Sequence, residues 1–253
     1  MNTTTRRTLR ALQASTLRLM RLPARVRGLV IIAPLAFYAA VMMLPLASER
    51  AFDAVTREDG LIEYAQFFAL VACGLLSGTQ ARRLWCRARG WALVYGAFAL
   101  VCLAAAGEEI SWGQRIFGIE TPQWYAANNH QAETTIHNLQ GVQELQAPVV
   151  VGVLAILSGL SIWGWTRGRS YSTIGRGLYL LIPHPMLLPA WICMIGYVGV
   201  LTLTHDVAGT SSSFYIGRLQ EPAELILIVG VAVFLAHVGW LERGRRSLRS
   251  AST

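Results

Sequence analysis

Six stretches of mostly apolar residues alternate along this chain with shorter polar segments. They run approximately over residues 28–47, 62–80, 91–107, 148–165, 186–204 and 221–240. About 20 apolar residues are needed for a helix to cross the hydrocarbon core of a membrane. The stretches are rich in Leu, Ala, Val and Ile, without the alternation that is typical of strands. The pattern therefore predicts an all-α integral membrane bundle of about six transmembrane helices.

Composition and charge support this class and add an orientation. The 253 residues are 54% hydrophobic and 14% charged, with a mean hydropathy of +0.43, which is too apolar for a soluble domain of this size. Of the 22 basic residues, all arginines, 18 flank one side of the stretches, whereas 13 of the 14 acidic residues lie on the other side. Because positively charged loops stay in the cytoplasm, we expect both termini inside. The predicted parts are a basic tail over 1–27, a polytopic membrane domain over 28–240 and a second basic tail over 241–253.

The sequence pI of about 9.9 does not indicate nucleic-acid binding. The arginine clusters directly flank the apolar stretches, and they are not interleaved with aromatic residues in the manner of a nucleic-acid-binding motif. Juxtamembrane clusters of this kind favour anionic lipids of the inner leaflet. The charge pattern therefore predicts membrane lipids as partners and leaves protein partners open.

The longest outer segment, residues 108–146, is too polar to span the membrane. Within it, Thr121 followed by Pro122 is a typical helix start. Gly141 is a typical helix stop. We therefore predict an extra interfacial helix over 122–140 on the outer face of the bundle.

Three residues on this predicted helix form a candidate metal site. At 100° per residue, His130, Glu133 and His137 fall within about 60° of one another and share one face. Two imidazoles and one carboxylate can bind a divalent transition metal such as zinc. The alternative is a surface helix that exposes polar residues on its wet face and binds no metal.

Two adjacent carboxylates, Glu108 and Glu109, end the third apolar stretch. Ionisable residues at the membrane edge are candidates for function, and carboxylates of this kind suit general acid or base catalysis. They are equally explained as solvated charges that mark the outer boundary of a helix. Glu63, Glu221 and Glu224 fall in the first turns of predicted helices, where acidic residues are favourable for structural reasons alone.

A longer motif joins several of these residues. The strings GEEISWGQRIFG (residues 107–118), ETP (120–122) and ETTIHNL (133–139) resemble an outer-loop motif of a family of uncharacterised bacterial multi-pass membrane proteins. The resemblance implies a bacterial inner membrane as the location, and one common site, but no activity. The residues that it groups are Glu108, Glu109, Trp112, Gln114, Arg115, Glu133, His137 and Asn138.

A site at the depth of the lipid headgroups favours a hydrolase or transferase that acts on a lipid or lipid-linked substrate. In this hypothesis Glu108 or Glu109 is the general base, and His137 is a metal ligand or a second acid/base group. The Arg115 guanidinium would bind an anionic headgroup through two parallel hydrogen bonds. The residues predicted to bind substrate are Trp112, Gln114, Arg115 and Asn138.

The sequence leaves open whether the chain is an enzyme at all. No nucleophile or metal motif is complete, although the loop over 204–220, with His205 and Asp206, is a candidate for a mobile lid. The alternative is a membrane transporter, or an assembly protein that binds a partner through its acidic and aromatic outer face. A transporter is expected to carry polar groups or broken helices at mid-membrane depth, and only the region over 183–189 looks broken.

Overall fold

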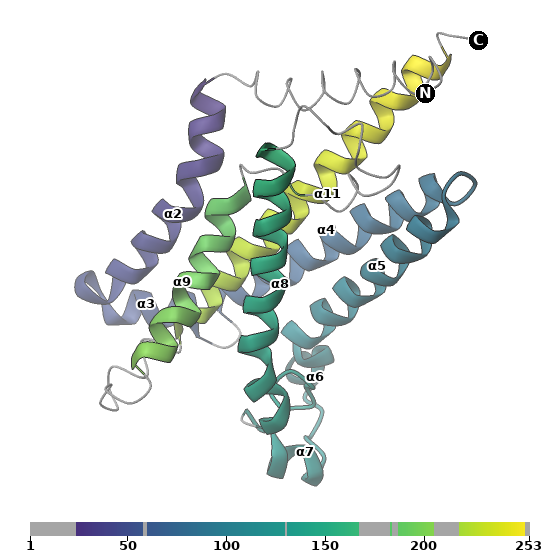
Figure 1. Ribbon diagram of the computed structural model, residues 1–253. Helices are drawn as coiled ribbons and strands as arrows, with labels where there is room; N and C mark the ends of the chain where they lie inside the picture. The colour runs from purple at the N-terminus through teal and green to yellow at the C-terminus, as the bar shows by residue number, and fades with distance from the viewer. Residues whose placement is uncertain are drawn as a thin grey trace.

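The computed structural model describes residues 24–57, 60–129, 131–166, 183, 187–204 and 218–250. Within these ranges the fold is all-helical, as predicted, apart from one isolated β-bridge between Asn129 and Leu139. The long helices are α2 (Ala24–Ala47), α4 (Leu61–Leu84), α5 (Arg89–Glu109), α8 (Gln140–Thr166), α9 (Leu188–Thr204) and α11 (Gln220–Ser250) (Figure 1). The short elements are α3 (Glu49–Thr56), a three-residue turn η1 (Ser111–Gly113), α6 (Gln114–Phe117) and α7 (Gln123–Asn128).

Four helical segments of the described residues are long and apolar enough to cross a membrane. They are Gly28–Ala47, Arg89–Glu109, Gln220–Gly239 and Glu49–Leu84, the last of which combines α3 and α4 and includes residues 58 and 59, outside the described ranges. The apolar parts of α8 and α9, Pro148–Trp163 and Leu188–Val200, are shorter. An apolar helix therefore occupies each of the six predicted places, and four of the six have the length that a span requires.

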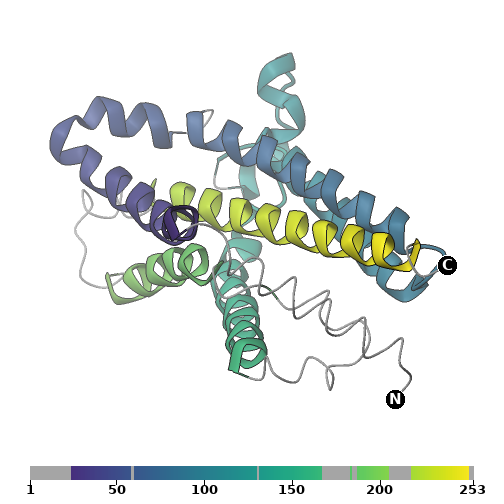
Figure 2. The same cartoon turned by 90° about the horizontal axis from the view of Figure 1, so that it is seen from above.

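Helix α11 lies at the centre of the packing. In Figure 2 it runs between α2 and α9 on one side and the antiparallel pair of α4 and α5 on the other. Its Ile226 belongs to a core cluster with Trp191 of α9. Its Leu235 belongs to a second cluster with Cys73 of α4 and Tyr95 of α5. Helix α9 on one side and the pair of α4 and α5 on the other are thus both packed against α11.

The predicted interfacial helix over 122–140 is wrong in extent, because α7 ends after six residues and 129–139 is an irregular loop. The Asn129 side chain explains the break. Its Oδ1 accepts a hydrogen bond from the Gln131 N–H at 2.8 Å, and its Nδ2 donates to the carbonyl and hydroxyl oxygens of Thr135 at 2.8 and 3.0 Å. Asparagine side chains that bond to nearby backbone in this way compete with helical hydrogen bonds.

The segment over 108–146 gathers at one end of the bundle, where α6 and α7 lie near the end of α5 and the start of α8 (Figure 1). Gly141, the predicted helix stop, lies instead in the first turn of α8. His130, His205 and Asp206 lie outside the described residues, as do residues 1–23 of the predicted N-terminal tail. Helix α11 continues through 241–250 of the predicted C-terminal tail.

Candidate functional site

The chain leaves α5 through a left-handed turn. Ser111, Trp112 and Gly113 have φ angles of +48°, +54° and +76°. The left-handed region costs about 1–2 kcal/mol for each residue with a Cβ, so the surrounding contacts must hold this turn. One such contact is the Trp112 ring, which lies so close to Gly107 that a Cβ at that glycine would be 2.8 Å from it. The turn directs two neighbouring side chains to two different carboxylates.

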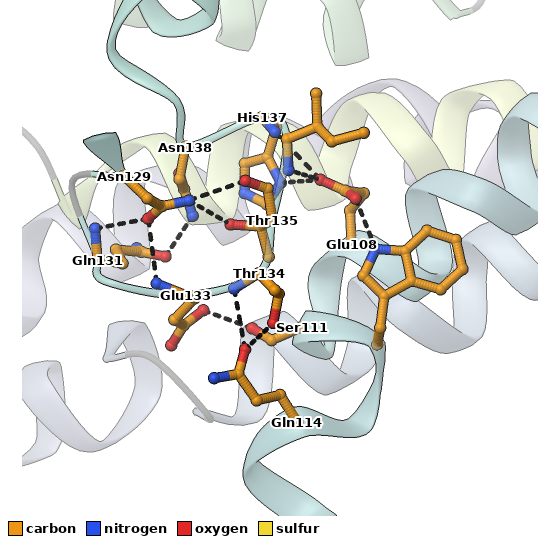
Figure 3. A network of polar contacts seen from close by, with 12 residues as sticks. Glu108, Ser111, Gln114, Asn129, Gln131, Glu133, Thr134, Thr135, His137 and Asn138 are labelled. Atoms are coloured by element: carbon orange, nitrogen blue, oxygen red, sulfur yellow. Dashed lines mark hydrogen bonds and ion pairs between the residues drawn. The ribbon is translucent and has the colours of Figure 1, made fainter. Parts of the chain in front are cut away.

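The first of these carboxylates, Glu108, accepts hydrogen bonds from several donors (Figure 3). The Trp112 Nε1–H donates to Oε1 at 2.6 Å. Oε2 accepts from the backbone N–H groups of Ile136 at 2.5 Å and His137 at 3.1 Å, and the His137 Nδ1 lies 3.2 Å away. Glu108 therefore fastens the 129–139 loop to the end of α5.

The Glu108–His137 contact also fixes the imidazole. When Nδ1 donates to a carboxylate, Nε2 carries the lone pair that can accept a proton. The His137 side chain keeps 40% of its surface exposed, whereas that of Glu108 keeps 13%. The arrangement is thus a carboxylate-oriented histidine with an accessible ring, which is the geometry of a general base.

The second carboxylate, Glu133, is buried and fully engaged. It accepts a hydrogen bond from the Ser111 hydroxyl and forms an ion pair with Arg115 Nη2 at 2.6 Å. Ser111 itself is 1% exposed. Arg115, predicted to bind an anionic headgroup, therefore neutralises a buried carboxylate of its own segment.

Two amide side chains complete the network. The Gln114 Oε1 accepts from the backbone N–H of Thr134 at 2.9 Å and from the Thr134 hydroxyl, while its Nε2 donates to the Thr121 hydroxyl. The Asn138 Nδ2 donates to Gln131 Oε1. Gln114 and Asn138, both predicted to bind substrate, are buried and hold the loop in place.

The predicted metal set does not assemble among the described residues. Glu133 and His137 contact different partners, and His130 lies outside those residues. In the described ranges, no group of three or more His, Cys, Asp or Glu side chains is arranged to hold a metal ion. The helix over 122–140 on which the common face depended is not formed, and because His130 lies outside the described residues the metal site stays a prediction.

Glu109, the other predicted catalytic carboxylate, faces a different part of the molecule. Its carboxylate interacts electrostatically with those of Glu224 and Glu221 on α11 and of Glu63 on α4, and with neighbouring Glu108. Successive residues of a helix point about 100° apart. The structure therefore separates the pair, and the proximity of Glu63, Glu221 and Glu224 is a feature that the sequence pattern did not reveal.

Exposed apolar side chains surround the polar network. They come from the turn, from α6, from α7 and from the loops on both sides of α7. They are Trp112, Ile116, Phe117, Ile119, Trp124 and Ile136. Six large apolar side chains exposed within one short segment are typical of a protein or membrane contact.

Three residues that organise the network were not singled out in the sequence. Ser111 bonds to Glu133, Thr134 bonds to Gln114, and Asn129 sets the path of the loop. The pair Asn128-Asn129 is the one available signal, because asparagine at a helix end favours a turn. The contacts of Ser111 and Thr134 depend on tertiary structure and leave no local pattern.

Comparison of the chain with protein-family models, with curated proteins and with solved structures finds no match. The function proposed below therefore depends on the geometry of the site and on the charge pattern of the sequence.

Proposed function

We propose that this chain is a multi-pass protein of the bacterial inner membrane, with both termini in the cytoplasm and the polar network facing outward. The four long apolar segments support membrane insertion. The exposed Leu93, Leu100 and Val101 of α5 support it as well, because a helix that faces lipid exposes large apolar residues. The arginine distribution supports the orientation.

The reaction that we propose is hydrolysis or transfer at the headgroup of a lipid or lipid-linked substrate. His137 acts as the general base, and its Nε2 takes a proton from a water or alcohol as that oxygen attacks the substrate ester. The bond between the ester centre and its original alcohol oxygen then breaks, and that alcohol leaves with the proton that the imidazolium returns. Glu108 orients the ring and stabilises the imidazolium that forms. The observation that carries the proposal is the Nδ1–Oε2 contact of 3.2 Å on a histidine with an accessible ring.

The apolar surface beside His137 supports a lipid as the substrate. Trp112 and Ile136 are exposed on either side of the Glu108–His137 contact, and Trp124 is exposed on α7. Tryptophan favours the headgroup level of a membrane. A lipid headgroup would thus meet the histidine without leaving the bilayer.

The test uses the purified full chain in lipid nanodiscs, supplied with a bacterial lipid extract and followed by mass spectrometry of the lipids. The wild type is expected to convert one lipid class, and His137→Ala is expected to lower the rate at least about 100-fold, the usual contribution of a general base. Glu120→Gln, which removes an exposed charge from the same segment, is the control and should leave the rate unchanged. Equal conversion by the wild type and His137→Ala would refute the base, and no conversion by either would refute the enzyme.

A second function, partner binding, is favoured by the engagement of Gln114, Glu133 and Asn138 within the network. In that case the network is a rigid support for the apolar surface, and that surface is the binding site. Trp124→Ala and Phe117→Ala would then abolish co-purification of a partner, whereas His137→Ala would not. This pattern separates a binding protein from an enzyme.

A further inference from the structure

The Trp112 side chain is held by contacts on both its ring and its N–H group. The ring packs against Gly107, where an added Cβ would lie 2.8 Å from it. The Nε1–H donates to Glu108 Oε1 at 2.6 Å. The backbone of Trp112 lies in the left-handed region, with a φ angle of +54°. The indole is thus positioned by the protein, although Trp112 is 56% exposed.

The preceding residue, Ser111, anchors the turn that carries Trp112. It is also left-handed, with a φ angle of +48°, and it is 1% exposed. Its hydroxyl donates to Glu133, which is paired with Arg115. Residues with a side chain persist in this backbone region where their surroundings hold them, and they gather at functional sites. Two such residues in succession therefore point to a function for the position of Trp112.

The carboxylate of Glu108 divides its two oxygens between the turn and the loop over 129–139. Oε1 accepts from the indole, whereas Oε2 accepts from the backbone N–H groups of Ile136 and His137 at 2.5 and 3.1 Å (Figure 3). The His137 Nδ1 lies 3.2 Å from the same Oε2. This contact is the longest of the four, so it is the first to be lost if the carboxylate turns.

The indole prevents such a turn. A carboxylate with both oxygens free can serve two backbone N–H groups with one oxygen each. In that arrangement neither oxygen of Glu108 would be directed at the imidazole of His137. Because the indole N–H engages Oε1, Oε2 stays directed at all three donors of the loop.

We propose that Trp112 is a positioning residue, whose N–H holds the Glu108 carboxylate in the orientation that fixes the His137 ring. As a role in catalysis this rests on the function proposed above, in which His137 is the base. The indole N–H is engaged with Glu108, so a lipid meets Trp112 through the exposed apolar ring. Trp112 therefore acts on the reaction through Glu108 and His137.

Trp112→Phe tests this hydrogen bond, because phenylalanine keeps an aromatic ring and lacks the N–H. NMR of the full chain in lipid nanodiscs, with isotope-labelled histidine, identifies His137 by the signal that His137→Ala removes. The wild type is expected to show one fixed tautomer with the proton on Nδ1, and Trp112→Phe a mixture of both tautomers. Trp124→Phe, at an exposed tryptophan of the same segment, is the matched control and should give the wild-type signal.

A second pair of variants displaces the indole without altering it. Gly107→Ala places a Cβ against the ring, so the ring must move, and the His137 tautomer should be released as in Trp112→Phe. Gly90→Ala lies in the same helix, α5, with no atom within 4 Å of the new Cβ, and it should leave the tautomer fixed. Thermal unfolding of both variants checks that α5 is intact.

The lipid assay described above separates positioning from substrate binding. Trp112→Phe is expected to lower kcat about 10-fold, the equivalent of one hydrogen bond to a charged group, and to leave KM for the lipid unchanged. Trp124→Phe should leave kcat unchanged. A raised KM with an unchanged kcat in Trp112→Phe would make this residue a substrate contact and overturn the proposal.

The NMR result stands apart from the activity. A wild-type His137 ring without a fixed tautomer would overturn the positioning role, and so would a tautomer that stays fixed in Trp112→Phe or is released in either control. If the tautomer depends on Trp112 but the wild type converts no lipid, the proposed reaction is refuted and the positioning of the ring is confirmed.

Discussion

Glu108 and Glu109 are neighbours in the chain, and their surroundings are opposite. Glu108 accepts two backbone hydrogen bonds and one from an indole, and it holds a histidine ring. Glu109 faces three carboxylates from two other helices. The first environment supplies hydrogen-bond donors to the carboxylate, and the second supplies other acidic side chains. Because a helical step turns the side chain by about 100°, the end of α5 serves two different polar regions.

The comparison teaches that one motif can contain two sites. In the sequence the two glutamates form a pair with one suggested role. In the structure Glu108 belongs to a network formed within residues 108–138, whereas Glu109 depends on contacts between helices distant in the chain. The four variants below test whether the two regions are as different as their geometry indicates.

The largest effect is expected on the Glu108 side, from Arg115→Ala. This change leaves Glu133 buried without its cation, which costs about 3–5 kcal/mol. Equilibrium unfolding in mixed micelles measures the loss. Adding Glu133→Gln should recover most of the stability, because the remaining side chain is neutral. A single variant as stable as the wild type would show that the ion pair does not hold the network.

Glu108→Ala is expected to cost about 2–3 kcal/mol, because the Ile136 and His137 N–H groups and the Trp112 indole lose their acceptor. The same unfolding measurement applies, and NMR of the His137 ring reports whether its tautomer is still fixed. Glu120→Ala is the matched control and should leave both readouts unchanged. An unaltered His137 signal in Glu108→Ala would contradict the orienting role.

Gly113→Ala tests the turn that separates the two regions. The cost is expected to be about 2 kcal/mol, since the new Cβ has a positive φ and meets the Phe117 ring at 2.9 Å. Gly118→Ala also has a positive φ, +64°, but no atom within 4 Å of the new Cβ, so its cost should be about 1 kcal/mol. Equal losses in thermal unfolding would mean that the Phe117 contact contributes nothing.

Glu109→Gln should have the smallest effect on stability, a change within about 0.5 kcal/mol or a slight gain, because it removes a charge from among like charges. Unfolding at neutral pH measures it beside Glu108→Gln, which weakens hydrogen bonds to a charged acceptor and should destabilise. If Glu109→Gln were the more destabilising of the two, the contrast between the regions would be wrong.

The long helices could be predicted because their signal is local. A run of apolar residues marks each of them, and the predicted stretch over 91–107 lies within α5 (Arg89–Glu109). The short α3 gives no such run, and the Ser48 hydroxyl that caps it is its main local sign. The helix over 122–140 is predicted from a typical start at Thr121-Pro122 and a typical stop at Gly141. The side-chain hydrogen bonds of Asn129 outweigh these two signals and end the helix early.

The candidate site was predictable in its members but not in their contacts. The motif grouped Glu108, Trp112 and His137, which the structure brings together. The roles of Arg115 and Gln114 depend on a loop about twenty residues away, whose path no periodicity reveals. The interaction of Glu109 with Glu63, Glu221 and Glu224 depends on the packing of α4, α5 and α11, and each of these residues alone looks like an ordinary residue at a helix end.

The central place of α11 has a consequence for biogenesis. This helix follows α2, α4, α5, α8 and α9 in the chain, yet both core clusters include its residues. Until α11 has been synthesised, the amide of Gln66 lacks the Glu221 carbonyl to which it donates. In the membrane insertion proposed above, the earlier helices are therefore inserted before the Gln66 amide has this acceptor. A chain truncated before α11 should consequently be recognised by membrane quality-control proteases and degraded.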